Sequence, residues 1–205
     1  ANNSGASNTA VGYTALTSNT TGAQNTAVGQ ASLYTNTTGN YNVAVGRAAL
    51  NANTTASNNT AVGYNAGAAI TGAGADNTAV GYLALTSDTT GYRNVAVGAY
   101  ALETNIDSHY NVAVGWGALR STTVGANTAI GYGSGLVVST GDRNTFLGNE
   151  SGKAVTSGAH NVLIGHMAGW SDTLTTTASK QILIGAYAKA ASATSDNNIE
   201  IGRAH

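Results

Sequence analysis

The stretch Asn8-Thr9-Ala10-Val11-Gly12 decides the fold, because the chain repeats it with little change from end to end. Copies of the pattern Asn-x-Ala-Val-Gly begin at Asn8, Asn25, Asn42, Asn59, Asn77, Asn94, Asn111, Asn127, Asn144 and Asn161, and looser copies begin at Gln181 and Asn198. Most successive copies start the same number of residues apart as Asn8 and Asn25 do. The distance is one residue longer after Asn59, one residue shorter after Asn111, and longest after Asn161. Because these units account for nearly all 205 residues, we expect a single repeat domain over residues 1–205.

Each unit continues with a second half that closes in a turn, of the form aromatic-x-Ala-Leu-x-x-Asn-Thr-Thr-Gly, as in Tyr13 to Gly22. A helical repeat needs about 33 residues or more per unit, which is too long for this period. Seventeen residues with a turn at each end leave room for two strands of about five residues. The sequence therefore predicts an all-β chain, a parallel β-solenoid of about twelve 17-residue coils.

The third and fourth positions of the repeat predict which faces are covered. Because side chains alternate along a strand, the Ala and the Val of each unit point to opposite faces. The narrow interior favours the Ala column, which places the Val column outside; the alternative is the reverse, with Val inside and Ala on the surface. The Val column consists of Val11, Val28, Val45, Val62, Val80, Val97, Val114, Ile130, Leu147, Ile164, Ile184 and Ile201.

An outer column of twelve aliphatic side chains needs a cover. At roughly 4.8 Å per coil it forms an apolar stripe on the order of 55 Å long. Soluble monomers rarely expose so large an apolar patch, and a closed cyclic homo-oligomer buries it without leaving an open edge. We therefore expect a homo-oligomer whose interface is the Val column.

Composition excludes several classes of protein. Charged residues make up 8% of the chain and the formal net charge is -1, so we expect no nucleic-acid partner. The absence of Cys excludes disulfides, and no apolar stretch approaches the roughly 20 residues of a membrane span, so the chain is not membrane-embedded. The nine acids are scattered and the four His lack ligand spacing. We therefore expect no catalytic residue, no metal and no cofactor, and no enzyme activity.

Exposed aromatic residues are the candidates for ligand binding, because amphipathic rings make good anchors on a rigid surface. The candidates are Tyr100, Tyr110, Trp116 and Trp170. Trp116 belongs to the column that directly follows the fixed Gly, where the alternative is that the rings only pack on one another. Loops carry recognition more often than regular ladders do, so residues 100–110 and 170–180 are the preferred regions.

The repeats resemble the head repeat of trimeric autotransporter adhesins and the NTAVGY-type repeats of bacteriophage tail fibres. The closing units Asn144–Gly152 (NTFLGNESG) and Asn161–Gly169 (NVLIGHMAG) are especially similar to fibre segments that precede a self-cleaving intramolecular chaperone. The resemblance implies a left-handed parallel β-roll, assembled as a homotrimer, that binds a glycan or protein receptor on a cell surface. It also implies an extracellular or virion-surface location. The longer period and the long turns depart from the adhesin heads.

Two other functions remain open. Thr pairs recur at coil spacing, as at Thr20–Thr21 and Thr37–Thr38, which is typical of a monomeric ice-binding β-solenoid. Against this, adjacent residues of a strand face opposite ways. A polysaccharide-degrading tailspike would need its two carboxylates to come from distant coils or from neighbouring chains.

Overall fold

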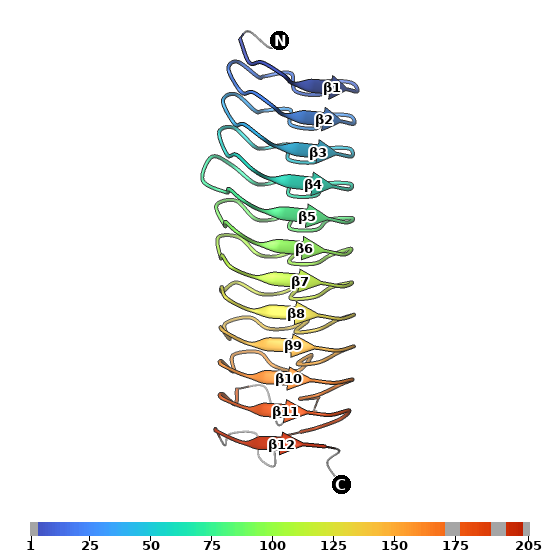
Figure 1. The fold of residues 1–205 in the computed structure, drawn as a ribbon, viewed down its shortest axis with the longest axis vertical. Coiled ribbons are helices and arrows are strands. Elements are labelled where there is room, and N and C mark those ends of the chain that lie inside the picture. Colours follow the sequence, from blue (N-terminus) through green and yellow to red (C-terminus); the bar gives the residue numbers. More distant parts are fainter. Residues whose placement is uncertain (1–3, 171–176, 190–195, 203–205) are drawn as a thin grey trace.

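The computed structural model describes residues 4–170, 177–189 and 196–202, which form a stack of coils with one strand each (Figure 1). All twelve strands belong to one parallel sheet and follow one another in chain order. They are β1 (Thr9–Val11), β2 (Thr26–Val28), β3 (Val43–Val45), β4 (Thr60–Val62), β5 (Thr78–Val80), β6 (Val95–Val97), β7 (Val112–Val114), β8 (Thr128–Ile130), β9 (Thr145–Leu147), β10 (Val162–Ile164), β11 (Ile182–Ile184) and β12 (Ile199–Ile201). The prediction of an all-β parallel solenoid is confirmed. Within the described residues, no helix is long and apolar enough to cross a membrane.

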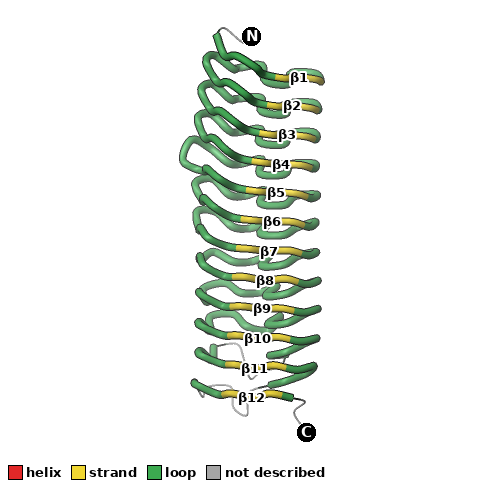
Figure 2. The backbone as a smooth tube through the Cα atoms, in the orientation of Figure 1, coloured by secondary structure: helices red, strands yellow, loops and turns green. Residues whose placement is uncertain are grey.

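Each coil holds one strand of three residues and not the two strands of about five that the repeat predicts (Figure 2). In the second half of the coil the backbone is left-handed at two positions, for example at Ala31 (φ 57°) and Leu33 (φ 47°). Left-handed residues cannot continue a strand, so this half turns the chain back towards the next coil. The same geometry explains why Gly replaces Leu at positions such as Gly67, since Gly adopts a positive φ without strain.

The fixed Gly at the end of each strand is required for two reasons. Gly29 has a φ of 128°, a backbone conformation that is essentially restricted to glycine. A Cβ at Gly29 would also lie 2.6 Å from the carbonyl oxygen of Gly46 in the next coil. The column of Gly therefore sets how closely successive coils stack.

The Ala column fills the interior, as the narrow coil requires. Ala27, Ala44 and the other described Ala of this column from β2 to β8 are buried, and they pack beside a column of buried Leu. The reverse assignment, with Val inside, is wrong. In the two coils where Phe146 and Leu163 replace the Ala, Gly replaces the Leu: a Cβ at Gly169 would lie 2.5 Å from Leu163 Cδ1 in the same coil. The interior therefore keeps a similar volume along the stack.

Buried Asn side chains at the first position of the repeat join the coils. Asn25 Oδ1 accepts the backbone N–H of Asn42 at 3.0 Å, and Asn25 Nδ2 donates to the carbonyl oxygen of Gly39 at 2.8 Å. Such bonds recur from coil to coil and form an Asn ladder, in which the Asn itself has no positive φ. The left-handed residue is the preceding one, Gln24 (φ 58°). Because the preceding side chain need not fit inside, this turn position is variable.

Candidate functional site

The first candidate surface is the outer face of the sheet, defined as the second and fourth repeat positions of every strand. In β3 the Val43 and Val45 side chains are half-buried on this face, and Ala44 between them is fully buried. The exposed fraction is 37% at Val62 and 41% at Ile130, and it is higher in the terminal coils, with 58% at Val11 and 75% at Ile201. In a single chain the predicted interface column is thus partly open to water along its length. No charged residue occupies this face in any of the described strands.

The second candidate surface is an aromatic ladder formed by Tyr64, Tyr82, Tyr100, Trp116 and Tyr132. Ring centroids of successive members lie 5.4, 5.4, 6.0 and 4.9 Å apart. Tyr100 joins this ladder, although its sequence position is one residue beyond the column; its ring takes the place that Ala99 leaves empty. The alternative of mutual packing is therefore the observed arrangement, and the ladder presents ring edges and hydroxyls to solvent.

Two arginines extend the aromatic ladder. The Arg47 guanidinium lies 5.4 Å from the centroid of the Tyr64 ring, and Arg47 Nη1 donates to the Tyr64 hydroxyl at 2.9 Å. The Arg120 guanidinium lies 4.8 Å from the centroid of the Tyr100 ring and forms a 2.5 Å ion pair with Glu103. Cation–π contacts of this kind stabilise exposed rings by about 0.5–1 kcal/mol each. The sequence alone does not predict these contacts, because the partners of the two arginines are one coil away.

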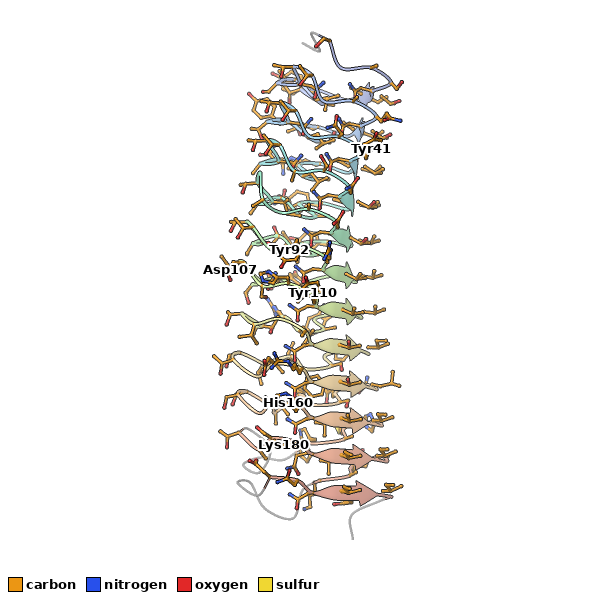
Figure 3. All side chains as sticks on the ribbon, turned by 60° about the vertical axis from the view of Figure 1, so that its left-hand side comes forward. Tyr41, Tyr92, Asp107, Tyr110, His160 and Lys180 are labelled. Atoms are coloured by element: carbon orange, nitrogen blue, oxygen red, sulfur yellow. The ribbon has the colours of Figure 1, made fainter. Side chains whose placement is uncertain are left out.

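The third candidate surface lies at the other end of the strands, along the turn column, which we define as the residues directly before the first repeat position. Figure 3 shows Tyr41, Tyr110, His160 and Lys180 of this column following one another along the solenoid. All of its described members have a positive φ, between 53° and 66°. Because these side chains point away from the interior, this column can vary freely in size and charge.

Around Tyr110 the turn column forms a cluster with Tyr92, Arg93 and His109. The Tyr92 ring stacks on the His109 ring at a centroid distance of 4.2 Å and meets the Tyr110 ring edge-to-face at 5.3 Å. The Arg93 guanidinium lies over the Tyr110 ring, 5.9 Å from its centroid, and pairs with Asp76 at 3.6 Å. Hydrogen bonding between the two phenols lowers the pKa of Tyr110 and raises that of Tyr92.

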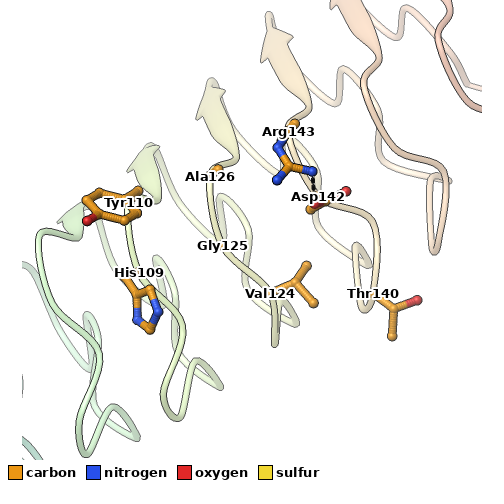
Figure 4. Close-up of a pocket in the computed structure, with 8 residues that line it drawn as sticks. All are labelled: His109, Tyr110, Val124, Gly125, Ala126, Thr140, Asp142 and Arg143. Atoms are coloured by element: carbon orange, nitrogen blue, oxygen red, sulfur yellow. Dashed lines mark hydrogen bonds and ion pairs between the residues drawn. The ribbon is translucent and has the colours of Figure 1, made fainter.

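Beside this cluster the surface is hollowed into a recess of about 520 Å³. Figure 4 shows that its walls come from three successive coils. The lining residues are His109, Tyr110, Val124, Gly125, Ala126, Thr140, Asp142 and Arg143. On the far wall, Arg143 Nη1 donates to Asp142 Oδ2 at 2.7 Å. The recess combines an aromatic wall, a small apolar floor and one ion pair.

Among the described residues, Asp88 is an ionisable side chain that is fully buried in the interior of the solenoid. It stands in a second column of buried amides, in which Asn105 Nδ2 donates to Asp88 Oδ2 at 2.8 Å. Burial raises the pKa of Asp88 to about 6, although hydrogen bonds from Gly91, Asn105 and Asn94 act in the opposite direction. Because this carboxyl group faces other buried side chains, it is a stability feature and not a ligand site.

Other titratable groups form no cluster in the described ranges. Four acids are engaged in ion pairs, Asp76 with Arg93, Glu103 with Arg120, Asp142 with Arg143 and Glu150 with Lys153. No group of three or more His, Cys, Asp or Glu among the described residues is placed to hold a metal ion. His205 lies outside the described residues.

The structure separates the four predicted ligand residues. Tyr100 and Trp116 are in contact, with ring centroids 6.0 Å apart. Tyr110 precedes β7 and Trp116 follows it, so these two lie at opposite ends of the strand. Trp170 lies after β10, is 41% exposed, and donates its backbone N–H to Met167. Residues 171–176 of the preferred region 170–180 lie outside the described residues.

The sequence contains a signal for the recess, although the repeat pattern alone does not predict it. The unit that begins at Asn111 is one residue shorter than the unit before it, and its turn carries Gly125 and Ala126 where the preceding coil has His109 and Tyr110. No protein-family model, curated protein or solved structure matches the chain. Its function is therefore inferred from these surfaces.

Proposed function

We propose that this chain is a rigid attachment segment of a fibre or adhesin, assembled as a left-handed β-roll homotrimer, which binds a cell surface. The partly exposed Val column supports the trimer. It presents an unbroken aliphatic stripe with no charge, and a second copy of the same chain offers the same stripe at the same spacing. Three copies around one axis would cover all three stripes and leave no open edge.

The attachment role follows from the trimer and from the variable surfaces. A stack of coils with a buried Asn ladder and a Gly column is rigid, so side chains at its turns are held at fixed positions. Three identical weak sites on one rod gain avidity when a surface carries many copies of a ligand. The exposed aromatic residues and the recess are placed outside the outer sheet face, which leaves them available in this assembly.

The native mass of the chain in solution tests the assembly. Three chains of 20.3 kDa give 60.9 kDa. Val62→Asp places a charge in the middle of the stripe and should reduce the mass to that of one chain, while the 37% exposure of Val62 lets the fold survive. Thr38→Asp adds the same charge to an exposed turn and should keep the full mass. A single-chain mass for the unmodified protein, or a trimer of Val62→Asp, would refute the proposal.

A second candidate function is ice binding by a monomer, and one feature of the outer sheet face favours it. Thr26 and Val28 share this face, as Thr60 and Val62 do, so Thr and Val stand side by side on an uncharged face in these coils, although Val replaces the Thr in strands such as β3 and β6. The Thr pairs of the turns are less suitable, because the Thr20 hydroxyl donates to the Thr37 carbonyl. Thermal hysteresis from a single-chain species would support this candidate; its absence would leave the trimer.

A further inference from the structure

We propose that the recess at the shortened coil binds one neutral sugar unit of a surface glycan, between the Tyr110 ring and the Asp142–Arg143 pair. This inference rests on the proposed attachment function. It identifies the class of ligand that the chain binds and the place on the chain where that ligand binds. The recess exists because one coil departs from the repeat. A residue is missing from its turn, and Gly125 and Ala126 stand where the neighbouring coils carry large side chains.

Tyr110 and His109 form one wall of this recess. Arg93, in the preceding coil, lies over one side of the ring at 5.9 Å from its centroid. The next member of the turn column on the other side is Ala126, whose methyl group cannot cover a ring. On the side of the recess, the His109 ring meets the Tyr110 ring at a centroid distance of 5.9 Å, so these two rings together form the aromatic wall opposite Asp142 and Arg143 (Figure 4).

The size and chemistry of the recess fit a pyranose. Its volume of about 520 Å³ falls in the range of ligand sites, roughly 300–1,000 Å³. A pyranose has an apolar C–H face and a rim of hydroxyls, so it matches a wall that combines an aromatic ring with polar groups. Its hydroxyls both donate and accept; the Asp142 carboxylate accepts, the Arg143 guanidinium donates, and the Thr140 hydroxyl does both.

The charges of the recess favour a neutral sugar over an acidic one. Arg143 is held by Asp142 at 2.7 Å, so the only guanidinium of the lining is already neutralised. An acidic sugar or a phosphate would bring a second negative charge beside Asp142. A neutral sugar meets both members of the pair without this repulsion.

Ala126→Tyr tests the site by filling it without altering the backbone. Tyr already occupies the equivalent position in two other coils, at Tyr41 (φ 57°) and Tyr110 (φ 63°), and Ala126 has a φ of 63°. The matched control is Gln24→Tyr, at an exposed position of the same column (φ 58°) that is six coils from the recess. Both variants should keep the native mass of the unmodified protein.

The probes are the methyl glycosides of glucose, galactose and N-acetylglucosamine, with N-acetylneuraminic acid as the acidic comparison, measured by ligand-observed NMR. A single sugar unit should bind with a dissociation constant of about 1 mM. We expect at least one neutral glycoside to bind the unmodified protein and Gln24→Tyr equally, and to bind Ala126→Tyr at least tenfold more weakly. The inference is overturned if no neutral glycoside binds, if Ala126→Tyr binds as well as the control, or if only the acidic sugar binds.

Cell attachment separates this inference from the proposed function. If the fluorescently labelled trimer attaches to cells and Ala126→Tyr attaches equally well, the attachment function stands and the sugar site is refuted. If the glycosides bind in the recess but no tested cell surface retains the protein, the site stands and the attachment function fails. A changed native mass of Ala126→Tyr alone would mean that the recess receives a neighbouring subunit, which also overturns the sugar site.

Discussion

Replacing Asp88 by Asn should stabilise the solenoid at neutral pH. The carboxyl group is fully buried, and burial raises its pKa from 3.8 to about 6. The folded chain therefore binds this proton more tightly than the unfolded chain does, so the contribution of Asp88 to stability is complete below pH 3.8 and is lost as the pH rises through 6. At pH 7 the loss amounts to about 3 kcal/mol.

An amide fits this position because the same column already contains amides. Asn36 Nδ2 and Asn53 Nδ2 each donate to the carbonyl oxygen three residues later, at 3.1 Å. In Asp88→Asn the new amide oxygen can still accept from Asn105, and its NH₂ group can donate to the Gly91 carbonyl in the same way. We expect a gain in the free energy of unfolding of about 1–3 kcal/mol at pH 7 and a gain close to zero at pH 4.

Urea unfolding followed by circular dichroism, at pH 4 and pH 7 and at one fixed protein concentration, measures both values. Asp107→Asn is the control, because it removes an exposed carboxylate from the turn of the next coil, whose charge is the smallest of the influences on the Asp88 pKa (Figure 3). It should change stability by less than about 0.5 kcal/mol at either pH. An Asp88→Asn protein that is less stable at pH 7, or equally stabilised at both pH values, would refute the reasoning.

Two further predictions concern the Gly column and the interior. Gly29→Ala should lower the free energy of unfolding by about 3 kcal/mol or more, because its Cβ would meet the Gly46 carbonyl. Gly133→Ala should lower it by only about 1–2 kcal/mol, because the nearest atom is 3.8 Å away and the cost is that of placing Ala at a φ of 57°. Equal losses in urea unfolding would contradict this. Phe146→Ala should lose about 3–5 kcal/mol. Adding Gly152→Leu to Phe146→Ala should recover about 2 kcal/mol or more of the lost free energy of unfolding, because position 152 borders the Phe146 ring. A double variant that is no more stable than Phe146→Ala would show that the two side chains do not fill one common volume.

The repeat and its alternation were sufficient to predict the solenoid and the sidedness of its strands. Ala10 and Val11 alternate in the first unit as Ala27 and Val28 do in the second, and stacked strands must place equivalent residues above one another. The prediction of two strands per coil was wrong because the backbone is left-handed at residues such as Leu33. Gly or Asn at such a position would have indicated a positive φ, but Leu does not. Leu33 at its positive φ is stabilised by burial in the interior and by the hydrogen bond from its N–H to the Ala49 carbonyl in the next coil.

For the candidate site, single residues could be predicted but their grouping could not. Tyr100 and Tyr110 were recognised as exposed aromatic residues, yet one joins Tyr82 and Trp116 while the other joins Tyr92 and His109. Tyr82, Trp116 and Tyr92 lie one coil away from their partners in sequence, and only the stacking of coils determines which end of a strand they share.

The period, the parallel stacking and the column of aliphatic residues follow from the amino-acid sequence, because a short and nearly constant repeat forces the same contacts in every coil. The recess does not follow from it. A missing residue in the turn before Asn127 leaves the repeat pattern itself unchanged. It produces a recess only because Tyr110 on one side and Arg143 on the other are held in place by their own coils. Repetition is a local property that can be read along the chain; a departure from it makes a site only where neighbouring coils supply the walls.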